Sequence, residues 1–130
     1  MATLNRDEIL AASDILTELV PVPEWGGDVY VKGMTGAERD KFEASIIEQR
    51  GKTQTMNMAN IRAKLASLTI CDETGRRLFN EADVQLLSKK SAAALQRVFA
   101  VAQKLSGIGD EDVKELAEGV SDPFAASPSD

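Results

Sequence analysis

The side chains that most often carry out catalysis or bind metals are scarce in this sequence. It has no histidine and a single cysteine, Cys71, which excludes histidine-dependent triads, histidine general bases and cysteine-rich zinc sites. Two acidic clusters, Asp72-Glu73 and Asp110-Glu111-Asp112, offer oxygen ligands to a divalent cation, but neither has the ligand series of an EF-hand loop. Both suit a turn or the start of a helix, so we interpret them as structural. We therefore expect no metal, no cofactor and no enzymatic activity.

Cys71 and the glycines give no stronger chemical signal. The cysteine follows an apolar stretch that ends at Ile70, and no basic residue adjoins it. We expect a buried thiol in a reducing compartment rather than a reactive nucleophile. Gly26-Gly27 and Gly33 fit neither the phosphate loop nor the dinucleotide fingerprint. Turn geometry is the better interpretation of these glycines.

The charge and hydropathy of the chain limit its partners. Fifteen basic and 21 acidic residues give a net charge of -6, which repels a phosphate backbone and disfavours nucleic acid as a partner. No segment approaches the roughly 20 apolar residues of a membrane span. The amino terminus also lacks a basic region followed by an apolar run. We expect no membrane partner and a location in the cytoplasm.

Two segments near the amino terminus have the pattern of a β-hairpin. Valines alternate with other residues in Leu19-Val-Pro-Val-Pro23 and in Val29-Tyr-Val-Lys32, and Glu24-Trp-Gly-Gly27 between them supplies turn residues. The prolines predict that the first strand lies at the edge of a sheet. Directly after the hairpin, Thr35 and Glu38 have the spacing of a capping box, which predicts the start of a helix.

The rest of the chain is predicted to be mainly helical. Aromatic residues make up only 5% of the sequence, so the core must consist mainly of aliphatic side chains. Apolar periodicity and capping residues predict helices over residues 5–14, 36–49, 58–70, 80–87, 92–105 and 110–117. We expect the first helix to lie across the hairpin, and Phe42 and Ile46 to face the apolar stripe of the third. Residues 72–75 predict a turn within a short hairpin-like connection.

The predicted fold class is α+β, with a small N-terminal β-hairpin followed by a predominantly helical domain and a disordered C-terminal tail. The length of 130 residues suits one domain, which we place at residues 1–119. Residues 51–57 are polar and lack periodicity, so we expect an exposed, mobile loop there. Residues 120–130 contain two prolines and three serines without a helical period, which predicts the disordered tail.

A set of short segments runs through the chain from about residue 5 to residue 117. They are Trp25-Gly26-Gly27, Tyr30-Val31, Gly33-Met-Thr-Gly-Ala-Glu-Arg39, Phe42-Glu43-Ala44, Ile70-Cys-Asp-Glu-Thr-Gly75, Leu78-Phe79 and Ser91-Ala-Ala-Ala-Leu95. Together these segments resemble the small tail assembly chaperones of long-tailed bacteriophages, the siphoviruses. The resemblance implies a protein that binds the long helical tape measure protein and keeps it soluble while the tail tube polymerises around it. It implies no catalytic residue.

A rigid aromatic side chain and adaptable thioethers suit a partner that presents many similar helical segments. Trp25, Met34, Met56 and Phe124 are therefore the candidate partner-binding residues. Trp25 at the hairpin tip either packs on the first helix or meets a partner, and Phe124 in the tail is either incidental or an anchor in a partner's groove. Met58 continues an apolar stripe and is assigned to the core.

Two functions remain open from the sequence. The first is a tail assembly chaperone in the host cell cytoplasm that covers hydrophobic stripes on the tape measure protein; other tail proteins and further copies of this chain are additional candidate partners. The second is a structural virion subunit, a connector or tube-associated tail component, whose edge strand Val20–Val22 pairs with a neighbouring chain. Pro21 and Pro23 count against the second function because they remove backbone donors. An enzyme has the least support, since its polar constellation is missing.

Overall fold

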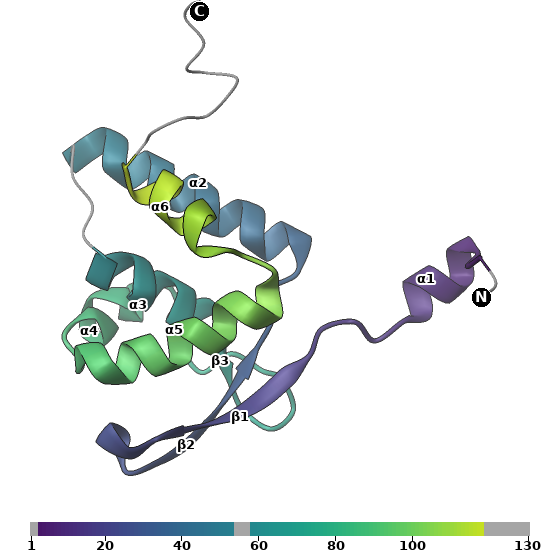
Figure 1. The fold of residues 1–130 in the computed structure, drawn as a ribbon, viewed down its shortest axis with the longest axis horizontal. Helices are drawn as coiled ribbons and strands as arrows, with labels where there is room; N and C mark the ends of the chain where they lie inside the picture. Colours follow the sequence, from purple (N-terminus) through teal and green to yellow (C-terminus); the bar gives the residue numbers. More distant parts are fainter. Residues whose placement is uncertain (1–2, 54–57, 119–130) are drawn as a thin grey trace, which may run out of the picture.

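The computed structural model describes the backbone of residues 3–53 and 58–118 and the side chains of residues 3–48 and 60–116. It combines a three-stranded antiparallel sheet of order β1-β2-β3 with helices (Figure 1). In chain order the elements are α1 (Arg6–Ala11), β1 (Thr17–Val22), η1 (Pro23–Trp25), β2 (Gly27–Lys32), α2 (Gly36–Thr53), α3 (Met58–Thr69), β3 (Ile70–Cys71), η2 (Glu81–Asp83), α4 (Val84–Ser88), α5 (Ala92–Ser106) and α6 (Asp110–Glu118). This arrangement confirms the predicted α+β class.

The N-terminal hairpin forms as predicted. Strands β1 and β2 pair with Val20 opposite Val29, and the short 3-10 helix η1 joins them, followed by Gly26 at φ 78° in the left-handed region. Glycine occupies this conformation at little cost. β1 lies at the edge of the sheet and has a neighbouring strand on one side only. Pro21, which has no backbone N–H to donate, is tolerated in such an edge strand. Val20, Val22 and Val31 turn to the core and are buried.

The third strand was not predicted. The helix that was expected to reach Ile70 ends at Thr69 as α3, and Ile70 and Cys71 then pair with Val31 and Tyr30 of β2. An isolated bridge between Cys71 and Arg77 closes the connection that follows. The predicted hairpin-like turn is therefore present, and it begins from a strand that is part of the sheet.

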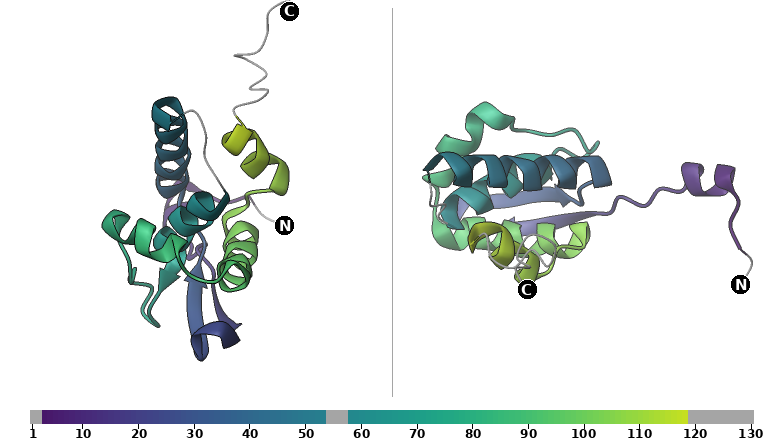
Figure 2. Two further views of the ribbon diagram at one scale, coloured as in Figure 1. Left: turned by 90° about the vertical axis from the view of Figure 1, so that its left-hand side faces the viewer. Right: turned by 90° about the horizontal axis from the view of Figure 1, so that it is seen from above.

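The core lies between the sheet and the helices. Helix α5 lies against both hairpin strands and against α3, while α2 contacts α3 and α6 (Figures 1 and 2). The predicted apolar faces are buried, including Phe42 and Ile46 of α2 and the following side chains of α3 and α5: Ile61, Leu65, Leu68, Leu95, Val98, Phe99 and Ala102. Burial of such stripes is the main source of stability for helices of this length.

Local capping signals are realised in the structure. Asn5 with Glu8, Thr35 with Glu38 and Asn80 with Asp83 each form reciprocal side-chain to backbone hydrogen bonds. These bonds satisfy backbone amides that have no partner within the helix. At the carboxyl end of α5, Gly107 takes a left-handed conformation with φ 71° and ends the helix.

Several expectations about helices are wrong. The first helix, expected over residues 5–14, ends at Ala11, and the helix expected over residues 80–87 begins as the 3-10 helix η2 and is α-helical only from Val84. Helix α1 does not lie across the hairpin: it stands apart from the body of the molecule, and residues 3–17 are all exposed (Figure 2). Helix α2 does not end at Arg50-Gly51 but continues to Thr53, because a single glycine costs a helix only about 1 kcal/mol. The predicted mobile loop at residues 51–57 is thus helical up to Thr53, and residues 54–57 lie outside the described part of the chain.

Candidate partner-binding surface

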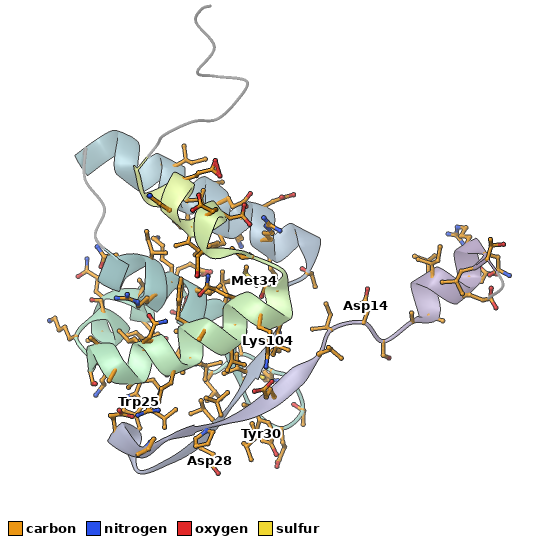
Figure 3. The ribbon with its side chains drawn as sticks, viewed as in Figure 1. Asp14, Trp25, Asp28, Tyr30, Met34 and Lys104 are labelled. Carbon is orange, nitrogen blue, oxygen red and sulfur yellow. The ribbon has the colours of Figure 1, made fainter. Side chains whose placement is uncertain are left out.

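Trp25 packs on the body of the protein and not on α1. It ends η1, is half-buried and contacts the hydrophobic core, and η1 lies against α5. Figure 3 shows it beneath α5, at the end of the hairpin remote from α1. The neighbouring carboxylate of Glu24 fixes this end of the hairpin by accepting a 3.0 Å hydrogen bond from Nε of Arg97. That bond lowers the pKa of Glu24. The indole Nε1 of Trp25 is buried without a hydrogen-bond partner in the described part of the chain.

Met34 is a core residue. The residue is 7% exposed, and its backbone amide donates a 2.9 Å hydrogen bond to Oγ of Ser106 at the end of α5. The preceding residue, Gly33, approaches the backbone of Leu105 closely. These contacts join the start of α2 to α5, so Met34 offers a partner little of its side chain.

The four candidate residues are not brought together as far as the structure describes them. Trp25 precedes β2 and Met34 follows it, so the two lie at opposite ends of this strand (Figure 3). Met56 and Phe124 lie outside the described residues, and so does the side chain of Met58. Contact between these residues and a partner stays a prediction.

The amino-terminal segment exposes apolar side chains that the sequence reasoning did not assign to a surface. Residues 3–16, which we call the N-terminal arm, carry five large exposed aliphatic side chains: Leu4, Ile9, Leu10, Ile15 and Leu16. A signal for them was present in the sequence. Leu4 and Ile9 occupy the two positions of a hydrophobic staple around the capping residue Asn5, a pattern that brings both side chains to the same side of the helix start.

A hollow with an apolar floor lies between α2, α3 and the η2–α4 segment. Its volume is 130 Å³, which suits a branched aliphatic side chain. We call it the α2–α3 groove; the lining residues are Lys41, Phe42, Ser45, Lys64, Ser67, Leu68, Glu81 and Val84. Because the side chains come from three segments far apart in the sequence, local patterns do not reveal it.

Charged side chains border the α2–α3 groove. Lys41 and Glu81 are exposed, while Lys64 is half-buried. The pKa of Glu81 is lowered, first by a hydrogen bond from its own backbone amide and then by the positive charges of Arg77 and Lys41. Glu81 is therefore ionised at neutral pH, and the groove presents two positive charges and one negative charge around an apolar floor.

The acidic clusters have structural partners. Oδ1 of Asp72 accepts hydrogen bonds from the hydroxyl and the amide of Thr74 and from the amide of Arg76, at 2.6, 2.8 and 3.0 Å. Oδ1 of Asp110 accepts a 2.9 Å bond from Gln103. The amide of Gly109, at the start of α6, donates a 2.9 Å bond to Oδ2 of Asp112. These bonds account for both clusters by turn and helix geometry.

The remaining candidate for chemistry is the thiol of Cys71. Its side chain is buried in β3, and burial raises its pKa. The thiol is thus buried as expected, and a buried thiol with a raised pKa is a poor nucleophile. Among the described residues, no group of three or more histidine, cysteine, aspartate or glutamate side chains is placed to hold a metal ion.

No helix within residues 3–53 and 58–118 has the length and apolar character that a membrane crossing requires.

Comparison with known proteins gives a match over almost the whole described chain. A family model described as phage tail assembly chaperone matches residues 6–118. The fold is similar to a solved structure titled "Structure of bacteriophage HK97 tail assembly chaperone", with a TM-score of 0.55 and 17% sequence identity over 80% of this chain and 95% of that chain. At this identity the likeness shows a shared fold. No match was found among curated proteins.

Proposed function

The chain belongs to the phage tail assembly chaperone family, and on this basis we propose that it binds the tape measure protein of its phage and keeps that protein soluble during tail tube assembly. The family match over residues 6–118 is the observation that carries the proposal. The site of action would be the host cell cytoplasm, where tail proteins are made and assembled.

The surface of the protein supports a binding role. Among the residues whose side chains the structure describes, nine large hydrophobic ones are exposed: Leu4, Ile9, Leu10, Ile15, Leu16, Leu19, Ile47, Leu78 and Leu86. Contiguous exposed apolar surface marks interaction sites in soluble proteins, and five of these nine residues lie together on the N-terminal arm. A net charge of -6 opposes non-specific association of such a surface with further copies. A chaperone for an apolar helical protein needs both properties.

We propose Trp25, Met56 and Phe124 as contact residues, together with the small part of Met34, 7% of the residue's surface, that is exposed. Trp25 is half-buried, so part of its ring remains available at the end of the hairpin. We also propose that the chain consists of a single domain at residues 1–119 and a partner-binding tail at residues 120–130. Phe124 lies in this tail, and the other contact residues lie in the domain.

The test is co-expression of this chain with the tape measure protein of the same phage. We expect the tape measure protein to be insoluble alone and soluble in a complex that carries many copies of this chain, as measured by co-purification and light scattering. Absence of association at low and at moderate salt would contradict the proposal. Trp25→Ala and Met56→Ala variants that fold correctly should bind less; unchanged binding would remove these two residues from the contact surface.

One structural observation favours a second candidate, a structural virion subunit. β1 lies at the edge of the sheet, where a strand from another chain could pair with it. Pro21 lies within β1 and has no amide to donate, which weakens such pairing. Purified tails distinguish the two functions: a structural subunit remains in them in fixed stoichiometry, whereas a chaperone is present only in assembly intermediates.

A further inference from the structure

The α2–α3 groove is a positively charged site in an acidic protein. Lys41 and Lys64 border it, and neither lysine forms an ion pair with another side chain that the structure describes. The acidic residue of the lining, Glu81, lies 3.5 Å from Nη1 of Arg77, so the two lysines determine the net charge here. The whole chain, in contrast, carries a net charge of -6. The groove therefore suits an occupant that combines an apolar side chain with a negative charge.

We propose that residues 119–130 of the same chain bind in the α2–α3 groove, with the ring of Phe124 on its apolar floor. Asp122 then lies beside Lys41, on the side of the groove that α2 forms. The hollow has a volume of 130 Å³, close to the roughly 150 Å³ of an apolar cavity that holds benzene. Its floor consists of the side chains of Phe42, Leu68 and Val84.

The sequence of the carboxyl-terminal segment matches this site. Residues 119–130, which lie outside the described part of the chain, include two acidic residues, Asp122 and Asp130, and no basic residue. Phe124 is the only aromatic residue among them. Because Pro123 follows it, Asp122 is restricted to extended backbone conformations, and residues two apart in an extended segment project on the same side. A carboxylate and a phenyl ring can thus face one surface together, as an apolar floor with a lysine border requires.

The segment begins within reach of the groove. Helix α6, whose last residue is Glu118, contacts α2, and α2 also forms one wall of the groove. Figure 2 shows α6 and the η2–α4 segment on opposite sides of α2, so the chain has to pass α2. The six residues from Glu118 to Phe124 span up to about 20 Å when extended, whereas a helix with its side chains is about 10–12 Å wide. Binding within one chain also provides an effective concentration on the order of millimolar.

Docking of the segment affects the partner-binding role proposed for Phe124. This side chain cannot contact the groove and a partner at the same time. A docked segment therefore withholds both Phe124 and the apolar floor from a partner, and its release exposes them together. The inference concerns the chain without a partner, so the experiments that test it are separate from those on binding of the tape measure protein.

Amide ¹H–¹⁵N NMR spectra of the full chain test the position of Phe124. Phe124→Ala should change the chemical shifts of the floor residues, because a nearby phenyl ring alters the resonances of the protons that face it. Ala125→Ser is the matched control: position 125 projects from the other side of an extended segment, so the floor amides should keep their shifts. The amides to follow are those of Phe42, Leu68 and Val84. Identical floor shifts in Phe124→Ala and in the wild type would overturn the proposal.

Reversal of charges tests the placement of Asp122 beside Lys41. Asp122→Lys and Lys41→Asp should each lower the docked fraction, measured from the shift of the Leu68 amide between its wild-type and Phe124→Ala values. An exposed ion pair contributes little, so we expect the docking constant to fall about twofold to fivefold. A chain with both substitutions should recover the wild-type shift, and Asp130→Lys is the control that should change it least. Failure of the double variant to recover would overturn the pairing of Asp122 with Lys41.

Disulfide formation distinguishes the same chain from other occupants of the groove. In a Cys71→Ala background, a chain with Phe124→Cys and Ser45→Cys should form an internal disulfide under mild oxidation. It should do so about tenfold faster than a chain with Phe124→Cys and Ile47→Cys, because docking holds the first pair of thiols together. Ile47 is the matched control, since it lies on the same helix, is 50% exposed and does not line the groove. Equal rates, or disulfide-linked dimers in place of the internal bond, would overturn the assignment to the same chain.

Discussion

Gly33 lies where the hairpin meets the carboxyl end of α5, and an added methyl group has no room there. A Cβ atom on Gly33 would lie 2.5 Å from the backbone oxygen of Leu105, and the two would have to move apart to at least 3.0 Å. That movement would stretch the hydrogen bonds that the amides of Gly33 and Met34 donate to the oxygen of Leu16 and to Oγ of Ser106. Overpacking costs about 1–3 kcal/mol and a weakened hydrogen bond about 1 kcal/mol. We expect Gly33→Ala to lower the free energy of unfolding by about 2–4 kcal/mol.

Urea unfolding, followed by the fluorescence of Trp25, measures this change. With a slope of about 2 kcal/mol/M, the unfolding midpoint should fall by about 1–2 M. Gly36→Ala is the matched control, since a Cβ atom on Gly36 meets nothing within 4 Å at the start of α2. Alanine favours the helix, so this control should unfold at the same or slightly higher urea. If Gly33→Ala unfolded at the midpoint of Gly36→Ala, the close approach between Gly33 and α5 would be refuted.

Two further predictions concern hydrogen bonds. Ser106→Ala removes the acceptor of the part-buried Met34 amide and should lower the free energy of unfolding by about 1–3 kcal/mol. Ser88→Ala, which loses only an exposed bond to a carbonyl of its own helix, should change it little; equal urea midpoints would contradict the role of the Ser106 hydroxyl. The pKa of Asp72 is lowered, first by the hydrogen bond from the Thr74 hydroxyl and then by backbone amides. Because the folded state favours the carboxylate, stability should fall as the pH drops below about 4. Asp72→Asn should show a smaller fall of Tm between neutral and acid pH, and an identical fall in both proteins would exclude this contribution.

The sequence predicts the elements that near neighbours determine. The capping boxes at Asn5, Thr35 and Asn80 each involve two residues three positions apart, so their pattern can be recognised in the sequence. The alternation around β1 and β2, with turn residues between them, is local in the same sense. The buried faces of α3 and α5 follow from a helical period that tertiary contacts then reinforce. The family model that matches residues 6–118 agrees with the resemblance to tail assembly chaperones that the short segments between residues 5 and 117 suggested.

The features that the sequence does not predict depend on contacts between distant segments. β3 contains two residues, too few for a strand pattern, and it is extended because Ile70 and Cys71 pair with β2. Met34 is buried next to the carboxyl end of α5, and the residues adjacent to it in the sequence do not predict this contact. Trp25 was expected to pack on the first helix or meet a partner, yet η1 lies against α5. The α2–α3 groove likewise needs three segments to be brought together before it exists.

The N-terminal arm combines a capped helix with exposed apolar side chains, and both features affect the free energy with which it could bind a partner. The capping box at Asn5 orders α1 before it binds, which lowers the entropy cost of docking. Burial of one exposed side chain such as Leu10 would contribute about 1.5–3 kcal/mol, while association costs at least about 4 kcal/mol. Stable binding through the arm would therefore require several of its exposed aliphatic side chains to be buried together.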